Sequence, residues 1–252
     1  MKIAKISRKA PQDSDATRPA GRSMRALEPH LRRLSLASQI ARKLEEEIVL
    51  GRRHPRERLI EQDLCEQFRT HRGDVRLALF ELERKGIVHR IPNRGAMVRD
   101  LSPDEVSSIY DVREELEVMA MRILPLPVPP KALAVLEKLQ RRHSDAVDAG
   151  DSLAVHYGNV QFHRELFGLC GNPCLIETIE HLAQRVSSIR SYAHAHAGAL
   201  ANSRRDHAEM IAALRDRRRD DLITLARRHL KPAVEAYILA YRQRFGGAGG
   251  DR

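Results

Sequence analysis

The sequence has no tryptophan, few aromatic residues (4%) and only three cysteines among 252 residues. Three cysteines cannot all pair with one another and no secretory signal precedes them, which argues against a disulfide-rich secreted domain. No run of about 18 apolar residues is present, which argues against a membrane-spanning helix. We therefore expect a cytoplasmic protein without a membrane partner, and its length allows two domains. Cys170 and Cys174 flank a helix break and are interpreted as small buried side chains rather than a metal pair.

Positive charge is concentrated near the N-terminus. Residues 1–34 hold nine Lys/Arg against three Asp/Glu, residues 35–100 hold fourteen against eleven, and the rest hold twenty-one against twenty. A basic segment gains by releasing condensed counterions from nucleic acid, which makes a polyanion a natural partner. A basic tail that aids solubility would explain the same charge, so charge alone does not distinguish a nucleic-acid partner from a solubilising tail.

The first hundred residues show the order of a winged helix-turn-helix. Residues 1–34 lack periodicity and are interpreted as a flexible basic arm. Apolar residues at helical spacing predict a helix that ends at Gly51, then a second over "LIEQDLCEQF", then a third from about Gly73 to Lys85. Two β-rich stretches joined by "PNRG" predict a hairpin. We assign residues 35–100 to one winged helix-turn-helix domain.

The remainder predicts helices only. "SPDE", from Ser102, is typical of a helix N-terminus. Helical segments follow near 103–124, 131–149, 151–169, 173–198, 202–217 and 220–245, with a break at "GALANS" and no strand pattern. The fold class is therefore mainly α, with an all-helical bundle of about six helices over residues 101–245 and a flexible tail over 246–252.

Two arginines mark the third helix as a candidate DNA-reading helix. Arg72 and Arg76 are four residues apart and share a face, while the apolar residues face away. Such a face presents guanidinium groups to guanine edges or phosphates. His71 and Thr70 add short donors at the helix N-terminus, where backbone N–H groups favour a phosphate. The alternative is an ordinary amphipathic helix whose arginines mix with glutamates in solvent.

Three histidines and an asparagine form a second pattern. Asn159 and His163 are four residues apart and share a helix face, while His207 and His229 lie on two later helices. Three imidazoles that meet at one point would suit a borderline divalent metal. The alternative for each histidine is an exposed side chain that binds nothing.

The stretch "EEIVLGRRHPRERLIEQDLCEQFRTHRGDVRLALFELERKGIVHRIPNRGAMV" resembles the DNA-binding domain of GntR-type bacterial transcription regulators. The resemblance implies that the domain binds a double-stranded DNA operator. Taken with the pattern of the third helix, the residues expected at the DNA are Thr70, His71, Arg72, Arg76, Arg94 and Gly95. One departure is Asp74, which stands where the family has proline; it could cap the helix or alter operator preference.

Residues from about 103 to 240 resemble the FCD effector domain of the FadR-like subgroup, through "IYDVREELE", "NVQFHRELFGLCGNP" and "DHAEMIAALRDRRRDDLITLARRHL". The resemblance implies a divalent metal, zinc with nickel or manganese as alternatives, held by Asn159, His163, His207 and His229. It also implies that Arg113 faces the effector; the alternative is a surface ion pair with Glu117. Neutral donors leave the charge of the ion uncompensated, so a small carboxylate effector is expected.

Together these patterns predict a ligand-responsive transcription regulator rather than an enzyme. We expect a homodimer, because one helix-turn-helix reads only half of a two-fold operator. The alternatives are a direct metal-ion sensor and a metal-dependent enzyme, although Glu165 is two residues from His163 and would point elsewhere.

Overall fold

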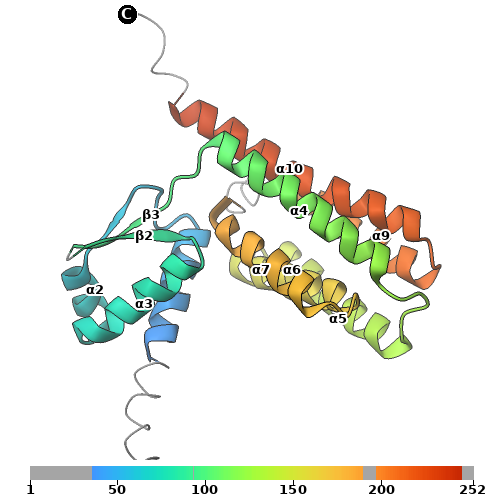
Figure 1. Cartoon of the computed structure of the whole chain (residues 1–252), viewed down its shortest axis with the longest axis horizontal. Coiled ribbons are helices and arrows are strands. Elements are labelled where there is room, and N and C mark those ends of the chain that lie inside the picture. Colours follow the sequence, from blue (N-terminus) through green and yellow to red (C-terminus); the bar gives the residue numbers. More distant parts are fainter. Residues whose placement is uncertain (1–35, 93, 190–196, 246–252) are drawn as a thin grey trace, which may run out of the picture.

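The computed structural model describes residues 36–92, 94–189 and 197–245. They form an N-terminal domain and a larger helical domain (Figure 1). The predicted basic arm and C-terminal tail lie outside the described residues. Among the residues that are described, no helix is both long and apolar enough to cross a membrane.

The N-terminal domain confirms the predicted winged helix-turn-helix. Its elements are a helix at residues 36–49, β1 (Arg58–Leu59), α2 (Glu61–Phe68), α3 (Arg72–Arg84), β2 (Val88–Ile91) and β3 (Gly95–Val98). The strands form an antiparallel sheet in the order β1-β3-β2. Its core contains Leu44, Leu64, Val75, Leu79 and Leu82. The two-residue strand β1 was not predicted, because it is too short to show alternation.

Gly95 lets the wing close onto β1. Its φ is +103°, and a Cβ added there would lie 2.0 Å from the carbonyl oxygen of Leu59. No other residue could occupy this position without moving a strand, since glycine alone has no Cβ. Gly95 therefore has a structural role, whether or not it also touches DNA.

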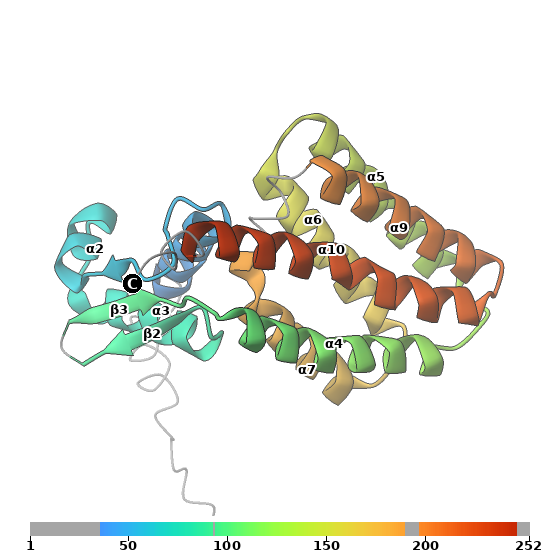
Figure 2. The ribbon, with the colours of Figure 1, turned by 90° about the horizontal axis from the view of Figure 1, so that it is seen from above.

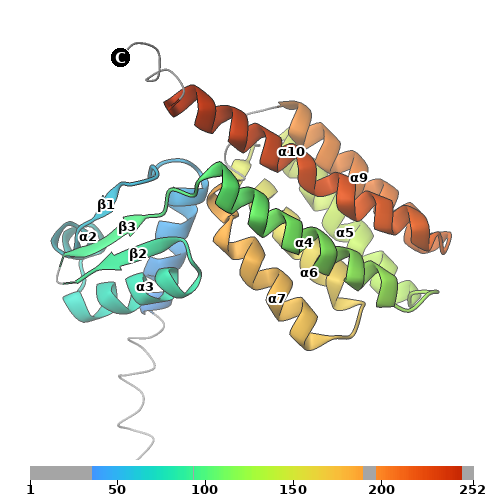
Figure 3. The ribbon, with the colours of Figure 1, turned by 45° about the horizontal axis from the view of Figure 1, so that its top comes forward.

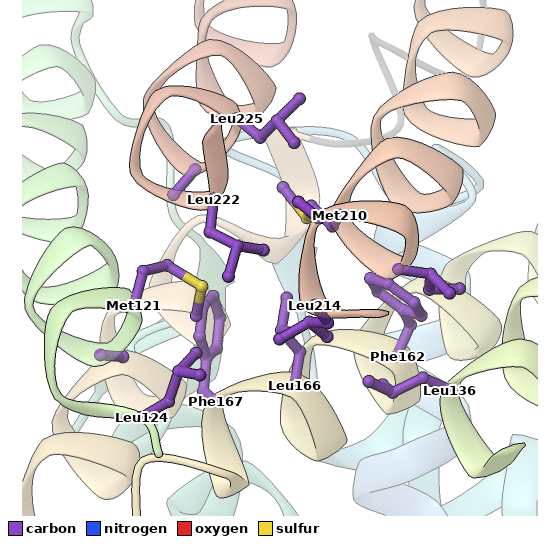
Figure 4. Close-up of a cluster of buried hydrophobic side chains, with 14 of the residues drawn as sticks. Met121, Leu124, Leu136, Phe162, Leu166, Phe167, Met210, Leu214, Leu222 and Leu225 are labelled. Carbon is purple, nitrogen blue, oxygen red and sulfur yellow. The ribbon is translucent and has the colours of Figure 1, made fainter. Parts of the chain in front are cut away.

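The helical domain consists of α4 (Pro103–Ile123), α5 (Pro130–Asp148), α6 (Ser152–Gly168), α7 (Pro173–Arg185), the short 3-10 helix η1 (Ser187–Ile189), α9 (Ala197–Arg215) and α10 (Arg219–Phe245). Helix α10 packs along α4 and α9, and α5 packs on α6 and α9 (Figures 1 and 2). The core between these helices is filled by Met121, Phe162, Leu166, Met210 and Leu222 (Figure 4). An all-helical second domain is thus confirmed.

Two details of the predicted helices are wrong. The helix expected over 173–198 ends at Arg185, and the expected break at residues 198–203 lies inside α9. The C-cap residue of α7 is Val186, whose φ of −107° and ψ of 17° leave the helical range. Gly198 falls in the first turn of α9, and one glycine in a helix costs only about 1 kcal/mol.

The expectation of two buried cysteines holds in part for Cys170 and is wrong for Cys174. Cys170 is partly buried and packs against the core, whereas Cys174 is exposed. Pro173 begins α7 and Asn172 caps it, accepting a hydrogen bond from the Leu175 N–H at 3.1 Å. Cys174 therefore lies in the first turn of a surface helix, which is why it is not enclosed.

The linker between the domains is tied to the C-terminal part of α10 (Figure 3). The Asp100 carboxylate accepts hydrogen bonds from Arg56 at 2.7 Å and from Arg244 at 2.6 Å. The Tyr237 hydroxyl donates to the carbonyl oxygen of Leu101. Helix α10 also contains Pro232, which has no N–H to donate to the preceding turn. One helix therefore contacts both the bundle and the linker.

Arg219 stabilises the C-terminus of α4. Its guanidinium donates to the carbonyl oxygens of Met121, Arg122 and Leu124 at 2.8, 2.6 and 3.0 Å. We expect Arg219→Ala to lower the free energy of unfolding by about 1.5–3 kcal/mol, because charge-assisted hydrogen bonds are lost. Arg218→Ala is the matched control, since its ion pairs with Asp216 and Asp221 are exposed and should contribute little. Urea unfolding measures both, and equal losses would contradict this role of Arg219.

Candidate functional site

The predicted DNA-reading arginines lie exposed on α3. The Arg72 Nη2 donates to the Gln62 side-chain oxygen at 3.3 Å, and the Arg76 Nε lies 3.0 Å from both carboxylate oxygens of Glu61. Both partners belong to α2 rather than to α3. Both arginines are thus held against α2, with the Arg76 side chain 54% exposed.

The start of α3 shows what Asp74 does. His71 is the N-cap residue, is exposed, and makes no side-chain capping bond. The Thr70 hydroxyl donates to the buried Asp74 carboxylate at 2.8 Å. Asp74 therefore does not cap the helix. Its charge lies in the first turn, where the positive end of the helix dipole stabilises it, and its contact fixes Thr70.

The wing carries the remaining predicted DNA residues. Arg94 is exposed immediately before β3, whereas Gly95 is buried. On β2, Arg90 forms an ion pair with Glu83 at 3.0 Å. The wing and α3 therefore both offer arginines to solvent, and the individual DNA contacts remain predictions.

The three predicted metal-binding histidines converge from three helices. The Nε2 of His163 on α6 lies 2.9 Å from the Nε2 of His229 on α10 and 3.2 Å from the Nε2 of His207 on α9. Two imidazole nitrogens bound to one zinc ion at about 2.0–2.1 Å would be roughly 2.8–3.4 Å apart. The spacing of the nitrogens therefore fits a shared divalent ion.

Second partners orient two of the rings. The His207 Nδ1 lies 3.0 Å from the side-chain oxygen of Gln140, and the His229 Nδ1 lies 3.3 Å from a carboxylate oxygen of Asp206. Because both partners accept hydrogen bonds, a proton on each Nδ1 would be held by its partner, and each Nε2 would be left to bind a metal. Neither partner was predicted. Asp206 precedes His207 in the sequence but pairs with a histidine on another helix.

Asp206 adds a negative charge beside the histidines. Its side chain is buried, and it also accepts a hydrogen bond from the Nε of Arg228 at 3.0 Å. Burial alone would raise the pKa of Asp206, but the hydrogen bonds from His229 and Arg228 outweigh it and hold the pKa below its ordinary value. The ionised carboxylate partly offsets the charge of a cation, in a site where the sequence indicated neutral donors only.

A cavity of about 80 Å³ opens beside the histidines. His163, His229 and Asp206 line it, as do the predicted residues Asn159 and Arg113. His207 is fully buried next to His163 and does not line the cavity. A water molecule needs about 10–15 Å³ by this kind of measure, so the space suits an ion with a few small ligand atoms.

Arg113 is buried rather than exposed. It donates to one Glu117 carboxylate oxygen at 2.8 Å from Nη2 and at 3.2 Å from Nε, and it lies 4.7 Å from the centre of the Tyr110 ring. Burial opposes its charge, yet Glu117 and Tyr110 outweigh this and raise the pKa of Arg113. Its Nη1 has no hydrogen-bond partner in the described chain. The ion pair with Glu117, expected as the alternative, therefore exists, but it is buried rather than at the surface.

Comparison with known proteins identifies both domains. Residues 36–98 match the gntR family of bacterial regulatory proteins, and residues 108–232 match the FCD domain. The Nta operon transcriptional regulator of Aminobacter aminovorans is 27% identical over 179 residues, which is 70% of this chain and 82% of that protein. The HTH-type transcriptional regulator McbR of Escherichia coli K12 is 28% identical over 156 residues, 62% of this chain and 71% of McbR.

The fold is also similar to that of a solved structure. Escherichia coli McbR/YncC superimposes with a TM-score of 0.71 at 23% identity, over 82% of this chain and 98% of that one. The winged helix-turn-helix, the helical domain behind it and the matches to both families agree with one another. The chain therefore belongs to the GntR family of bacterial regulatory proteins, as a DNA-binding transcriptional regulator that carries an FCD domain.

Proposed function

We propose that the helical domain senses a small organic acid through a divalent metal ion held by His163, His207 and His229. The observation that supports this proposal is the convergence of three Nε2 atoms. The Nε2 of His163 lies 2.9 Å from that of His229 and 3.2 Å from that of His207. Nδ1 protons held on His207 and His229 would leave the metal-facing nitrogens ready to bind. Imidazole nitrogens suit zinc or nickel, and manganese is a further alternative because the amide oxygen of Asn159 and an effector carboxylate would add the oxygen ligands that it prefers.

The donor set favours an anionic effector. When bound, the ion supplies a Lewis-acidic position to which a carboxylate oxygen can bind. Three neutral imidazoles and the amide of Asn159 leave positive charge in a mostly buried site, which Asp206 offsets only in part because it also pairs with Arg228. A carboxylate would complete the compensation, and Arg113, which lines the cavity, would provide a further donor.

An enzymatic role has less support. A hydrolase would need a general base directed at a metal-bound water. Glu165 is exposed on the outer face of α6, and Asp206 is engaged by His229 and Arg228. A direct metal-ion sensor is the stronger alternative, because the same histidines would serve it without an acid.

We further propose that the regulator acts as a cytoplasmic homodimer. A single winged helix-turn-helix reads one half-site, whereas two copies related by a two-fold axis read a palindromic operator. Sedimentation of the protein with and without operator DNA tests this proposal. A single chain bound to a complete two-fold operator would contradict it.

The effector proposal is tested by measuring operator affinity under four conditions. The operator is selected from a random-sequence library with the purified protein, and zinc-loaded and metal-stripped protein are each titrated with and without a panel of small carboxylic acids. A change in operator affinity that needs both zinc and an acid supports the proposal. A change with zinc alone identifies a direct metal sensor instead, and no change under any condition contradicts both.

The DNA-reading role of α3 gives a separate prediction. We expect Arg72→Ala and Arg76→Ala each to weaken operator binding by about 1–3 kcal/mol, the contribution of a good base contact, while the fold stays intact. Arg141→Ala removes one exposed positive charge from α5 and is the matched control. Fluorescence anisotropy at one salt concentration measures all three. Wild-type affinity in both α3 variants would show that this helix does not read the operator.

A further inference from the structure

A second and larger cavity lies between the two domains. Its volume is about 360 Å³, and it is distinct from the cavity beside the histidines, with which it shares only Arg113 and His163. The N-terminal domain contributes residues of the helix at 36–49 and of α3, and the helical domain contributes residues of α4, α6, α7 and η1. The volume falls within the range of small-molecule sites, which is roughly 300–1,000 Å³.

The charged side chains at the rim of this interdomain cavity are largely paired. Lys85 lies 2.5 Å from Glu45, and both belong to the N-terminal domain. Arg164 lies 2.7 Å from Glu180 within the helical domain. The Tyr157 hydroxyl donates to Glu46 across the domain boundary at 3.0 Å. Because these charged and polar groups are paired with one another, the described residues of the rim do not present a free charged surface to a ligand.

The inner wall combines apolar surface with two unsatisfied polar groups. Phe167 and Ile179 are buried in the wall, and the lining residue Val160 is 40% exposed. Ser187 is buried and its hydroxyl has no hydrogen-bond partner within the described part of the chain; the same is true of the Arg113 Nη1. Leaving a buried donor without an acceptor is unfavourable, so both groups call for an acceptor from a ligand.

We propose that the interdomain cavity binds an amphipathic organic anion, with its apolar body against Val160, Phe167 and Ile179 and its anionic group at Ser187 and Arg113. This site goes beyond the proposed metal-bound effector and does not need the metal; because Arg113 lines both cavities, its Nη1 serves one anion at a time. Because both domains line the cavity, a bound molecule holds the DNA-binding domain in one orientation relative to the helical domain. Its occupancy therefore changes operator affinity.

The probe is 8-anilinonaphthalene-1-sulfonate, an aromatic anion that fluoresces in apolar surroundings, with neutral N-phenyl-1-naphthylamine as the uncharged comparison. Both are titrated into the full-length, metal-stripped protein, so that failure of the metal proposal leaves this test intact. We expect one molecule of the anionic dye per chain, bound about tenfold more tightly than the neutral dye because of the charge-assisted hydrogen bonds.

Two variants locate the site. Ala183 lines the cavity from α7, and Ala183→Leu fills part of it, so we expect at least about tenfold weaker binding of both dyes. Ala134→Leu, on the exposed face of α5, is the matched control and leaves binding unchanged. Ser187→Ala removes one donor; it should weaken the anionic dye about fivefold and leave the neutral dye unaffected.

Operator affinity is then measured with and without saturating anionic dye. A change of at least about threefold in the wild type, absent in Ala183→Leu, supports the coupling between the domains. Equal dye binding by the wild type, Ala183→Leu and Ser187→Ala would overturn the site, as would no stoichiometric binding at all. If Ala183→Leu fails to fold, the affinities of the two dyes for Ser187→Ala still test the site. Unchanged operator affinity with the cavity filled would overturn the coupling.

Discussion

His207→Ala will abolish metal binding by the trihistidine site. Wild-type protein reconstituted with zinc should retain about one equivalent after dialysis and the variant less than about 0.1, because two imidazoles cannot replace three. His207 is the critical ligand for this test, since it is fully buried and its Nδ1 is already held by Gln140. Elemental analysis of the two proteins measures the difference directly.

The same variant will lose the stabilisation that zinc gives. An ion that links α6, α9 and α10 binds the folded state only, which contributes about 4 kcal/mol when the free metal is a thousandfold above Kd. We expect zinc to raise the Tm of the wild type by roughly 10 °C and that of the variant by nothing. Comparing each protein with its own metal-stripped form removes the effect of the cavity that the substitution creates.

His181→Ala, on the exposed face of α7, is the matched histidine control and should behave as the wild type. Less than about 0.1 equivalent of zinc, nickel and manganese in the reconstituted wild type would contradict the metal proposal. The three histidines would then be hydrogen-bonding groups of a metal-free pocket.

Arg113→Ala will destabilise the protein far more than removal of a surface arginine. Arg113 and Glu117 are 4% and 2% exposed, so the substitution leaves a carboxylate buried without its counter-charge. Breaking a buried pair in this way costs about 3–5 kcal/mol. Arg164→Ala breaks an ion pair with Glu180 in which the arginine is 66% exposed, and should cost no more than about 1 kcal/mol.

A double variant separates the buried charge from the packing. Arg113→Met combined with Glu117→Leu replaces both charged side chains by apolar ones of comparable volume, and we expect it to recover most of the stability lost in Arg113→Ala. Urea unfolding of the metal-stripped proteins measures these differences apart from any metal effect. Equal losses in Arg113→Ala and Arg164→Ala would mean that water reaches the buried pair.

Much of the fold could be predicted because local patterns decide it. The C-terminal end of the first helix near Gly51 and the start of α4 after Ser102 both follow from residue types that favour those positions. The spacing of Asn159 and His163 placed them on one face of a helix, and both line one cavity. By contrast, β1 forms only because β3 lies beside it, and no alternation over two residues could have indicated it.

The parts of the site that could not be predicted depend on how helices pack. Asp206 reaches His229 because α9 and α10 are neighbours, and Gln140 reaches His207 because α5 lies against α9. The spacing of Arg113 and Glu117 indicated an ion pair, but not that α4 turns this pair into the interior. Periodicity assigns a residue to a face of its own helix, whereas its partner across the bundle depends on tertiary packing.

Pro232 removes one backbone hydrogen bond from α10, between the part that carries His229 and the part that contacts the linker. His229 lies about one turn before Pro232 in α10. Tyr237 and Arg244, which contact the linker, lie after Pro232. At about 1.5 Å per residue the helix is roughly 40 Å long. The missing hydrogen bond makes bending less costly at Pro232 than elsewhere in the helix. Helix α10 is therefore one continuous element that carries both His229 and the linker contacts of Tyr237 and Arg244, with one backbone hydrogen bond fewer where these two parts meet.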